Sequence, residues 1–315
     1  MFIISVSLDI AKKNLNYLKT YQIKYIIRLF NMNTLNEWDK KLLTDVLDED
    51  IENVSISLKN GANIEVQLYD QMTPLHFAVE NGSLEMVKLL LEHGAEVNKS
   101  SYFGDSILMT ATKRENKEIL TILLQYRADV NVQDTMKRNV LHYAIMKRNS
   151  DICSILLENG VFVNQPDIFG ETPIYAAVIR RMDLEIIQKM VEKGGIISNT
   201  DACGHTALHR LILMAYKEDN DTVKYIDNLL SIHKELATLP SAVVDRTPLH
   251  VVAFTGNLEL LSVISAHTSE KDNSESLFSI TPEELAVVFE NNEVAKLLDI
   301  DLEDDESLLR ESISD

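Results

Sequence analysis

The chain has 315 residues, of which 45% are hydrophobic, and its formal net charge is −19. A chain this acidic is expected to repel nucleic acid unless its basic residues gather on one face. Its two cysteines cannot form a disulfide framework, and no run of about 18 apolar residues predicts a membrane-spanning helix.

The first predicted element is an amphipathic helix over residues 8–30. Tyr17, Tyr21 and Tyr25 stand four residues apart, and basic side chains lie around them at Lys12, Lys13, Lys19, Lys24 and Arg28. A basic helix with aromatic neighbours can lie on an anionic membrane surface. The interpretation that we favour is a helix that packs on the following segment as an extra cap. A third interpretation is that translation starts at Met32.

From residue 73 onward, a four-residue anchor returns at a nearly constant spacing. Thr73-Pro74-Leu75-His76 is its clearest copy, and later copies begin at Ser106, Asn139, Thr172, Thr206, Thr247 and Thr281. The steps between copies are 33, 33, 33, 34, 41 and 34 residues. A threonine N-cap followed by proline at the first helical position begins a helix. Two short runs with apolar residues at helical spacing follow the anchor, so the period predicts a solenoid of helix pairs.

Glycines end the second helix of several units, at Gly61, Gly94, Gly160 and Gly194, and Arg127 takes the same place in one unit. With the anchors, this pattern resembles the ankyrin repeat, whose motif is T-P-L-H-x-A. The resemblance covers roughly residues 40–298. It implies an all-α ankyrin-repeat solenoid, with a β-turn and a helix pair in each repeat of about 33 residues. It also implies that the anchor histidines make local hydrogen bonds that tie neighbouring repeats together.

The departures from the period divide the chain into five segments. They are an N-terminal amphipathic helical segment (1–39), an N-terminal capping half repeat (40–66), four regular repeats (67–199), three irregular repeats (200–300) and an acidic tail (301–315). Only the second half of the pattern is visible in 40–66. The unit from Thr206 is eight residues too long, and the units from Thr247 and Thr281 have weak glycine stops.

The histidines do not predict chemistry. His76, His142, His209 and His250 occupy the anchor, so each is expected to be structural. Cys203, His205 and His209 superficially suggest a metal site, but His205 lies in the turn before the helix, so no metal is expected there. No nucleophile elbow, phosphate-binding glycine loop or H-E-x-x-H motif is present. We therefore predict no catalytic residue, no cofactor and no metal, with an enzyme hidden in 206–298 as the least favoured alternative.

The resemblance implies that the turn before each anchor faces a partner. The turn residues of interest are Tyr69, Met72, Tyr102, Phe103, Met136, Arg138, Ile168 and Phe169. Large apolar groups in a row mark an interaction surface, and aromatic side chains and arginine are favoured anchors. The alternative is that Phe103 and Phe169, each of which precedes a glycine, pack against adjacent turns.

The end of the first helix is the second set of positions that the resemblance turns toward a partner. Basic doublets recur there, at Lys113-Arg114, Lys147-Arg148 and Arg180-Arg181. Arg114, Lys147 and Arg180 stand 33 residues apart, so they are predicted to stack in one column. One cation at a helix C-terminus stabilises the helix by ~0.3–1 kcal/mol, but this explains a doublet in three units less readily. We expect the column to receive an acidic or phosphorylated segment of a partner.

The sequence therefore predicts a non-catalytic protein–protein interaction module that acts as a scaffold, adaptor or inhibitor. The expected partner is another protein, not nucleic acid, and the chain is expected to be a cytoplasmic monomer. The alternative is a membrane-recruited adaptor, or a bacterial effector secreted into a host cytosol, that uses the helix over residues 8–30.

Overall fold

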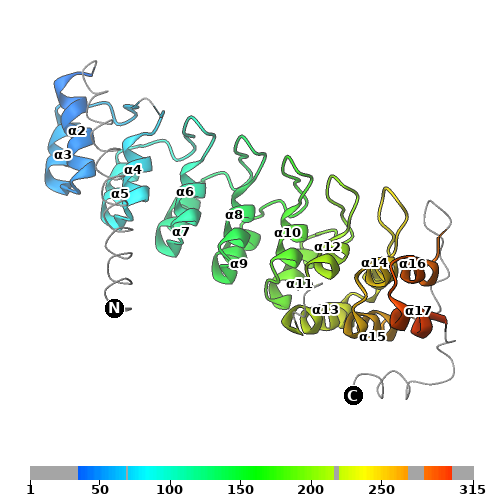
Figure 1. Ribbon diagram of the computed structural model, residues 1–315. Coiled ribbons are helices and arrows are strands. Elements are labelled where there is room, and N and C mark those ends of the chain that lie inside the picture. Colours follow the sequence, from blue (N-terminus) through cyan, green and yellow to red (C-terminus); the bar gives the residue numbers. More distant parts are fainter. Residues whose placement is uncertain (1–34, 69, 216–219, 269–279, 300–315) are drawn as a thin grey trace, which may run out of the picture. The chain divides into compact units, whose positions relative to one another are not determined.

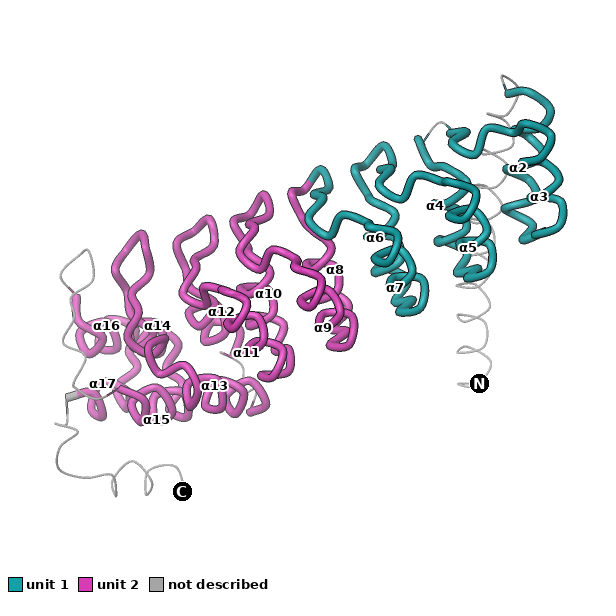
Figure 2. The backbone as a smooth tube through the Cα atoms, turned by 180° about the vertical axis from the view of Figure 1, so that it is seen from behind, with its two compact units in different colours: residues 1–135 teal, residues 136–315 magenta. Residues whose placement is uncertain are grey.

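The computed structural model describes residues 35–68, 70–215, 220–268 and 280–299. The chain forms two compact units, residues 1–135 and 136–315, which are described separately as unit 1 and unit 2 (Figure 2). The predicted helix over 8–30, Tyr69 and the acidic tail over 301–315 lie outside the described residues.

Unit 1 is a row of helix pairs (Figure 1). Its helices are α2 (Glu37–Leu47), α3 (Ile51–Lys59), α4 (Pro74–Asn81), α5 (Leu84–Glu92), α6 (Ile107–Lys113) and α7 (Lys117–Gln125). The first helices of neighbouring pairs pack on one another, α2 on α4 and α4 on α6, and α3, α5 and α7 form a second row.

Unit 2 repeats the same arrangement. Its helices are α8 (Val140–Met146), α9 (Ser150–Glu158), α10 (Pro173–Ile179), α11 (Leu184–Glu192), α12 (Ala207–Met214), α13 (Asn220–Ile232), the 3₁₀-helix η2 (Lys234–Ala237), α14 (Pro248–Thr255), α15 (Leu258–Ala266), α16 (Pro282–Val288) and α17 (Asn292–Asp299). The first helices α8, α10, α12, α14 and α16 pack in sequence order. Each irregular unit after residue 200 thus keeps a pair of helices.

The anchors begin their helices as the sequence predicts. Ser106 and Thr172 are N-caps whose side-chain oxygens accept backbone N–H bonds of 3.2 and 3.3 Å from the third helical residue. Four of the anchors, at Thr73, Thr172, Thr247 and Thr281, add a proline in the first turn. Each such cap contributes about 1 kcal/mol by satisfying a backbone donor that has no partner inside the helix.

The first pair in unit 1 differs from the expected half repeat. Helix α2 is present, so the segment holds both helices of a unit rather than only the second. Asn36 caps α2, and its side-chain oxygen accepts from the N–H of Asp39 at 2.8 Å. The residues after Asn36 are Glu37, Trp38 and Asp39, so the leucine and histidine of the anchor are absent, and the anchor pattern therefore did not predict this first helix. The expected boundary at residue 39 falls inside α2.

Among the described residues, several first helices end at a left-handed backbone position. In the first helices, the residue after the C-terminal turn is Gly82 or Gly256 in two units, but Glu115, Arg148 and Arg181 in others, with φ between 53 and 80°. A non-glycine residue in this conformation is strained by about 1 kcal/mol. Three successive units therefore accept strain where glycine would remove it.

The core of each unit is apolar and lies between the two helix rows. In unit 1 it includes Leu75, Phe77 and Met86, which are at most 1% exposed. A buried leucine replaced by alanine in such a core typically destabilises a protein by about 2–5 kcal/mol.

Both cysteines are free thiols: Cys153 is buried in α9 of unit 2, and Cys203 is exposed. Among the described residues, the helices are too short or too polar to cross a membrane.

Candidate functional site

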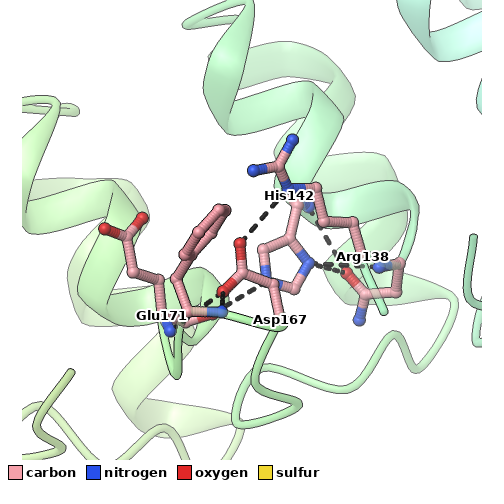
Figure 3. Close-up of polar contacts among 6 residues, drawn as sticks. Arg138, His142, Asp167 and Glu171 are labelled. Carbon is pink, nitrogen blue, oxygen red and sulfur yellow. Dashed lines mark hydrogen bonds and ion pairs between the residues drawn. The ribbon is translucent and has the colours of Figure 1, made fainter. Parts of the chain in front are cut away.

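Where the structure describes it, the turn that precedes an anchor projects from the helix pairs, and we call it a finger (Figure 1). The finger before α10 is ordered by Asp167, whose side chain is 2% exposed. One of its oxygens accepts backbone N–H bonds from Phe169 at 2.8 Å and Glu171 at 3.1 Å. The other accepts from Nε of Arg138 at 3.2 Å (Figure 3). The Arg138 charge is thus bound by a buried carboxylate, so this predicted partner residue orders the finger.

Neighbouring fingers are joined by single backbone hydrogen bonds within each unit. In unit 1, Tyr102 N–H donates to the Asp70 carbonyl at 2.8 Å, and Thr135 N–H donates to Phe103 at 3.5 Å. In unit 2, the donors are Ile168 to Met136 (3.1 Å), Ala202 to Phe169 (3.0 Å) and Ala242 to Gly204 (2.8 Å). These bonds hold the finger tips in a row without using their side chains.

The tips present large apolar side chains to solvent. Tyr102 and Phe103 are each 66% exposed and pack edge to face, with ring centroids 5.5 Å apart. Ile168 is 47% and Phe169 52% exposed. About half or more of each of these residues therefore remains accessible, although Phe103 and Phe169 also bond to neighbouring fingers through their backbones. Met72 and Met136 are half-buried.

The anchor histidines of unit 2 tie successive repeats together, as the resemblance implies. The Nδ1 atom of His142 accepts from Asn139 N–H at 3.1 Å, so its proton sits on Nε2, which donates to the Glu171 carbonyl at 3.2 Å (Figure 3). The same link joins Nε2 of His209 to the Arg246 carbonyl at 2.7 Å, and Nε2 of His250 to the Ile280 carbonyl at 3.0 Å. These histidines are structural.

Burial shifts the pKa of two anchor histidines and of one glutamate. Removal from water lowers the pKa of His76 in unit 1, and of His209 in unit 2, from 6.5 to about 4. Glu171 lies at the base of its finger, and burial and the nearby Asp167 charge raise the pKa of its carboxyl. His76 and His209 are therefore neutral at neutral pH.

The basic doublet of unit 1 is bound by carboxylates. Nζ of Lys113 lies 2.5 Å from Oδ1 of Asp105, and Nη2 of Arg114 lies 3.3 Å from Oε1 of Glu80. Both cations of this doublet therefore have acidic partners within the unit.

The doublets of unit 2 use their cations differently. Nη2 of Arg148 donates to the Arg181 carbonyl at 3.3 Å, and Nη1 of Arg181 donates to Oγ1 of Thr222 at 2.7 Å. Among the described residues of the unit, Arg180 forms no ion pair, and its side chain is exposed. Arg148 and Arg180 thus keep charge that a partner can reach.

The predicted column falls on equivalent positions of both units. Arg114, Lys147 and Arg180 are the C-cap residues of α6, α8 and α10. Arg114 belongs to unit 1, whereas Lys147 and Arg180 belong to unit 2, where both are exposed. Each of the three residues is thus the C-cap of a first helix, and their joint role in binding stays a prediction.

Sequence reasoning missed an apolar cluster at the ends of α14 and α16, the first helices of the last two repeats. Phe254 and Phe289 pack edge to face, with ring centroids 4.7 Å apart, and Val288 is 66% exposed. A signal was available, because Phe289 follows Thr281 by eight residues, as Arg180 follows Thr172. The ends of the first helices therefore change from basic to apolar along unit 2.

These helix pairs, joined by hydrogen-bonded fingers, define a helical repeat protein whose exposed features lie on turns and helix ends. A family model described as ankyrin repeats (3 copies) matches residues 19–101, 42–134, 98–167 and 141–226. The matches together span well over half of the chain, which belongs to the ankyrin repeat family. Ankyrin repeats are generally protein–protein interaction modules and are typically not enzymes. No curated protein matches the chain.

Proposed function

We propose that this protein is a non-catalytic binding module, a scaffold, adaptor or inhibitor, that captures another protein on its fingers. The observation that carries the proposal is the exposure of Tyr102 and Phe103 in unit 1 and of Ile168 and Phe169 in unit 2. Their backbones are already fixed by hydrogen bonds between fingers. A partner that buries them therefore orders little of the chain, and preorganisation of this kind strengthens binding.

Charge supports the same surface in unit 2. Lys147, Arg148 and Arg180 lie at the ends of the first helices in a chain of net charge −19. A local group of cations in an acidic protein attracts an anionic partner and limits binding elsewhere through repulsion. The partner segment is therefore an acidic or phosphorylated stretch that carries apolar residues for the finger tips.

The experiment compares the partners that the full chain and two variants recover by affinity purification and mass spectrometry. Ile168→Ser with Phe169→Ser removes the apolar tip of one finger, and we expect at least about a 30-fold loss of affinity for the recovered partner, since central interface residues contribute about 2 kcal/mol or more. The matched control is Phe162→Ser, because Phe162 is 57% exposed in the same unit but follows a second helix. Undiminished capture by the double variant would refute this surface.

A further inference from the structure

The finger before α12 brings together three side chains of the kinds that bind zinc. Asp201, Cys203 and His205 each offer one ligand atom, and these atoms lie within 4.8 Å of one another. They stand two residues apart along the turn. The carboxylate oxygen, thiol sulfur and imidazole nitrogen form a mixed set that differs from the ordinary acidic surface of this chain.

One ligand atom lacks a partner. Nδ1 of His205 is buried but has no hydrogen-bond partner among the described residues. It lies 3.8 Å from Oδ1 of Asp201, which is too long for a hydrogen bond. Two ligands on a tetrahedral zinc ion stand about 3.5 Å apart, given zinc–ligand distances of about 2.0–2.3 Å. This pair therefore already has nearly the separation that a shared ion requires, and the exposed Cys203 can turn toward it.

The Asp201 carboxylate is held in place by its neighbours. One oxygen accepts backbone N–H bonds from Cys203 at 2.9 Å and His205 at 3.0 Å, and the other accepts from the Tyr175 hydroxyl at 2.9 Å. Outer hydrogen bonds of this type orient carboxylates that ligate metals. The Asp201 side chain is only 8% exposed, so its position is also fixed by packing.

The preceding finger shows what is particular to this one. Asp167 accepts the same two backbone bonds from the residues two and four positions later, but these are Phe169 and Glu171. The two turns thus share one framework, and of these two it is the finger from Asp201 that places a sulfur and a nitrogen donor on it. His209, the partner that the sequence suggested for a metal, is bound instead to Thr206 and the Arg246 carbonyl.

The geometry points to a three-ligand zinc site formed by Asp201, Cys203 and His205, with the fourth position open to water or to a group of the bound partner. A thiolate and an imidazole select zinc over calcium or magnesium, which prefer oxygen ligands. The bound thiolate and carboxylate balance the two positive charges of the ion. The site lies on a finger tip, so a metal there stiffens the turn and adds a coordination point to the finger surface.

The test is a titration of the full-length reduced protein with Co²⁺, a spectroscopic substitute for zinc. We expect one equivalent to bind with a thiolate-to-cobalt charge-transfer band and to be displaced by Zn²⁺. Cys203→Ser should abolish the band, and His205→Ala should weaken binding at least about tenfold. Cys153→Ser is the matched control, since Cys153 is buried and burial raises the pKa of its thiol to about 12, so the band should persist.

Cobalt that binds without the band sits on carboxylates of this acidic chain, and that result would overturn the proposal. A band that survives Cys203→Ser, or one that disappears with Cys153→Ser, would also overturn it. Circular dichroism of each variant verifies that the helices are retained. The exposed side chain of Cys203 makes loss of folding by its replacement an unexpected outcome.

Discussion

Units 1 and 2 both carry basic doublets at the ends of first helices, but Lys113 and Arg114 of unit 1 have acidic partners that Arg148 and Arg180 of unit 2 do not have among the described residues. In unit 1, Lys113 and Arg114 meet Asp105 and Glu80. In unit 2, Arg148 binds a backbone carbonyl, and Arg180 is exposed without an ion pair among the described residues. Lys113 and Arg114 are thus paired with carboxylates in unit 1, whereas Arg148 and Arg180 of unit 2 keep exposed charge. An anionic partner should therefore distinguish the two units.

The largest expected effect concerns a property that the units share. His76 and His209 have pKa values of about 4 in the folded chain and 6.5 when unfolded, so the unfolded state binds more protons between these values. Stability is therefore full above pH 6.5 and falls as the pH drops toward 4. At pH 5 each histidine should lower the free energy of unfolding by about 2 kcal/mol relative to pH 7.

Urea unfolding at the two pH values measures this loss. His76→Gln in unit 1 and His209→Gln in unit 2 should each reduce the pH dependence by a similar amount. A pH response that only one variant changes would show that the units differ at their anchors as well as at their helix ends.

Charge reversal tests the difference between the units directly. Arg148→Glu with Arg180→Glu should weaken capture of the partner at least about 30-fold, because like charges then face each other across the interface. Lys113→Glu with Arg114→Glu should change affinity less than about threefold, since those cations already have acidic partners. Titration of the partner recovered with the full chain measures both variants. Equal losses of affinity in the two double variants would contradict the proposed difference between the units.

Glycine replacement separates backbone strain from charge. Arg127 in unit 1 and Arg148 in unit 2 both have left-handed backbones, with φ of 64° and 56°. Arg127→Gly should stabilise the chain by about 1 kcal/mol without affecting the partner. Arg148→Gly should stabilise it less, because the bond to the Arg181 carbonyl is lost, and should weaken capture. Thermal unfolding and the partner titration measure the two effects, and identical binding by both variants would contradict a role for Arg148.

The smallest effect is a gain of binding in unit 1. Glu80→Gln with Asp105→Asn should destabilise the chain by less than about 1 kcal/mol, because both ion pairs are partly exposed. It should also release Lys113 and Arg114, and it should tighten partner binding up to about threefold at low salt. The gain should vanish at high salt because exposed charges are screened. Tighter binding that salt leaves unchanged would point to another cause.

The anchor spacing was enough to predict most helix pairs, because a threonine or serine cap has the same local consequence wherever it occurs. The first pair escaped because Asn36 caps α2 without the other anchor residues. Local capping chemistry therefore has more than one sequence solution, and a motif search finds only the commonest.

The state of each doublet cation could not be predicted from its position. Arg114 meets Glu80, 34 residues earlier, and Lys113 meets Asp105, eight residues earlier. The first pair crosses from one repeat to the next and the second joins a helix to its own finger, and neither spacing follows from the anchor pattern. The sequence placed Arg138 on the partner surface, but it could not show that the buried Asp167 holds its guanidinium.

Each backbone hydrogen bond between two fingers contains an amide proton whose exchange reports the separation of those fingers. The amide protons of Ile168, Ala202 and Ala242 exchange with solvent only when their fingers separate. Nearest-neighbour stacks open locally at points of least cohesion, and hydrogen exchange measures such events site by site. The exchange rates of these three protons therefore report finger opening at three places along unit 2. A ligand that binds two neighbouring fingers would lower the exchange rate of the proton between them and leave the rates of more distant protons unchanged.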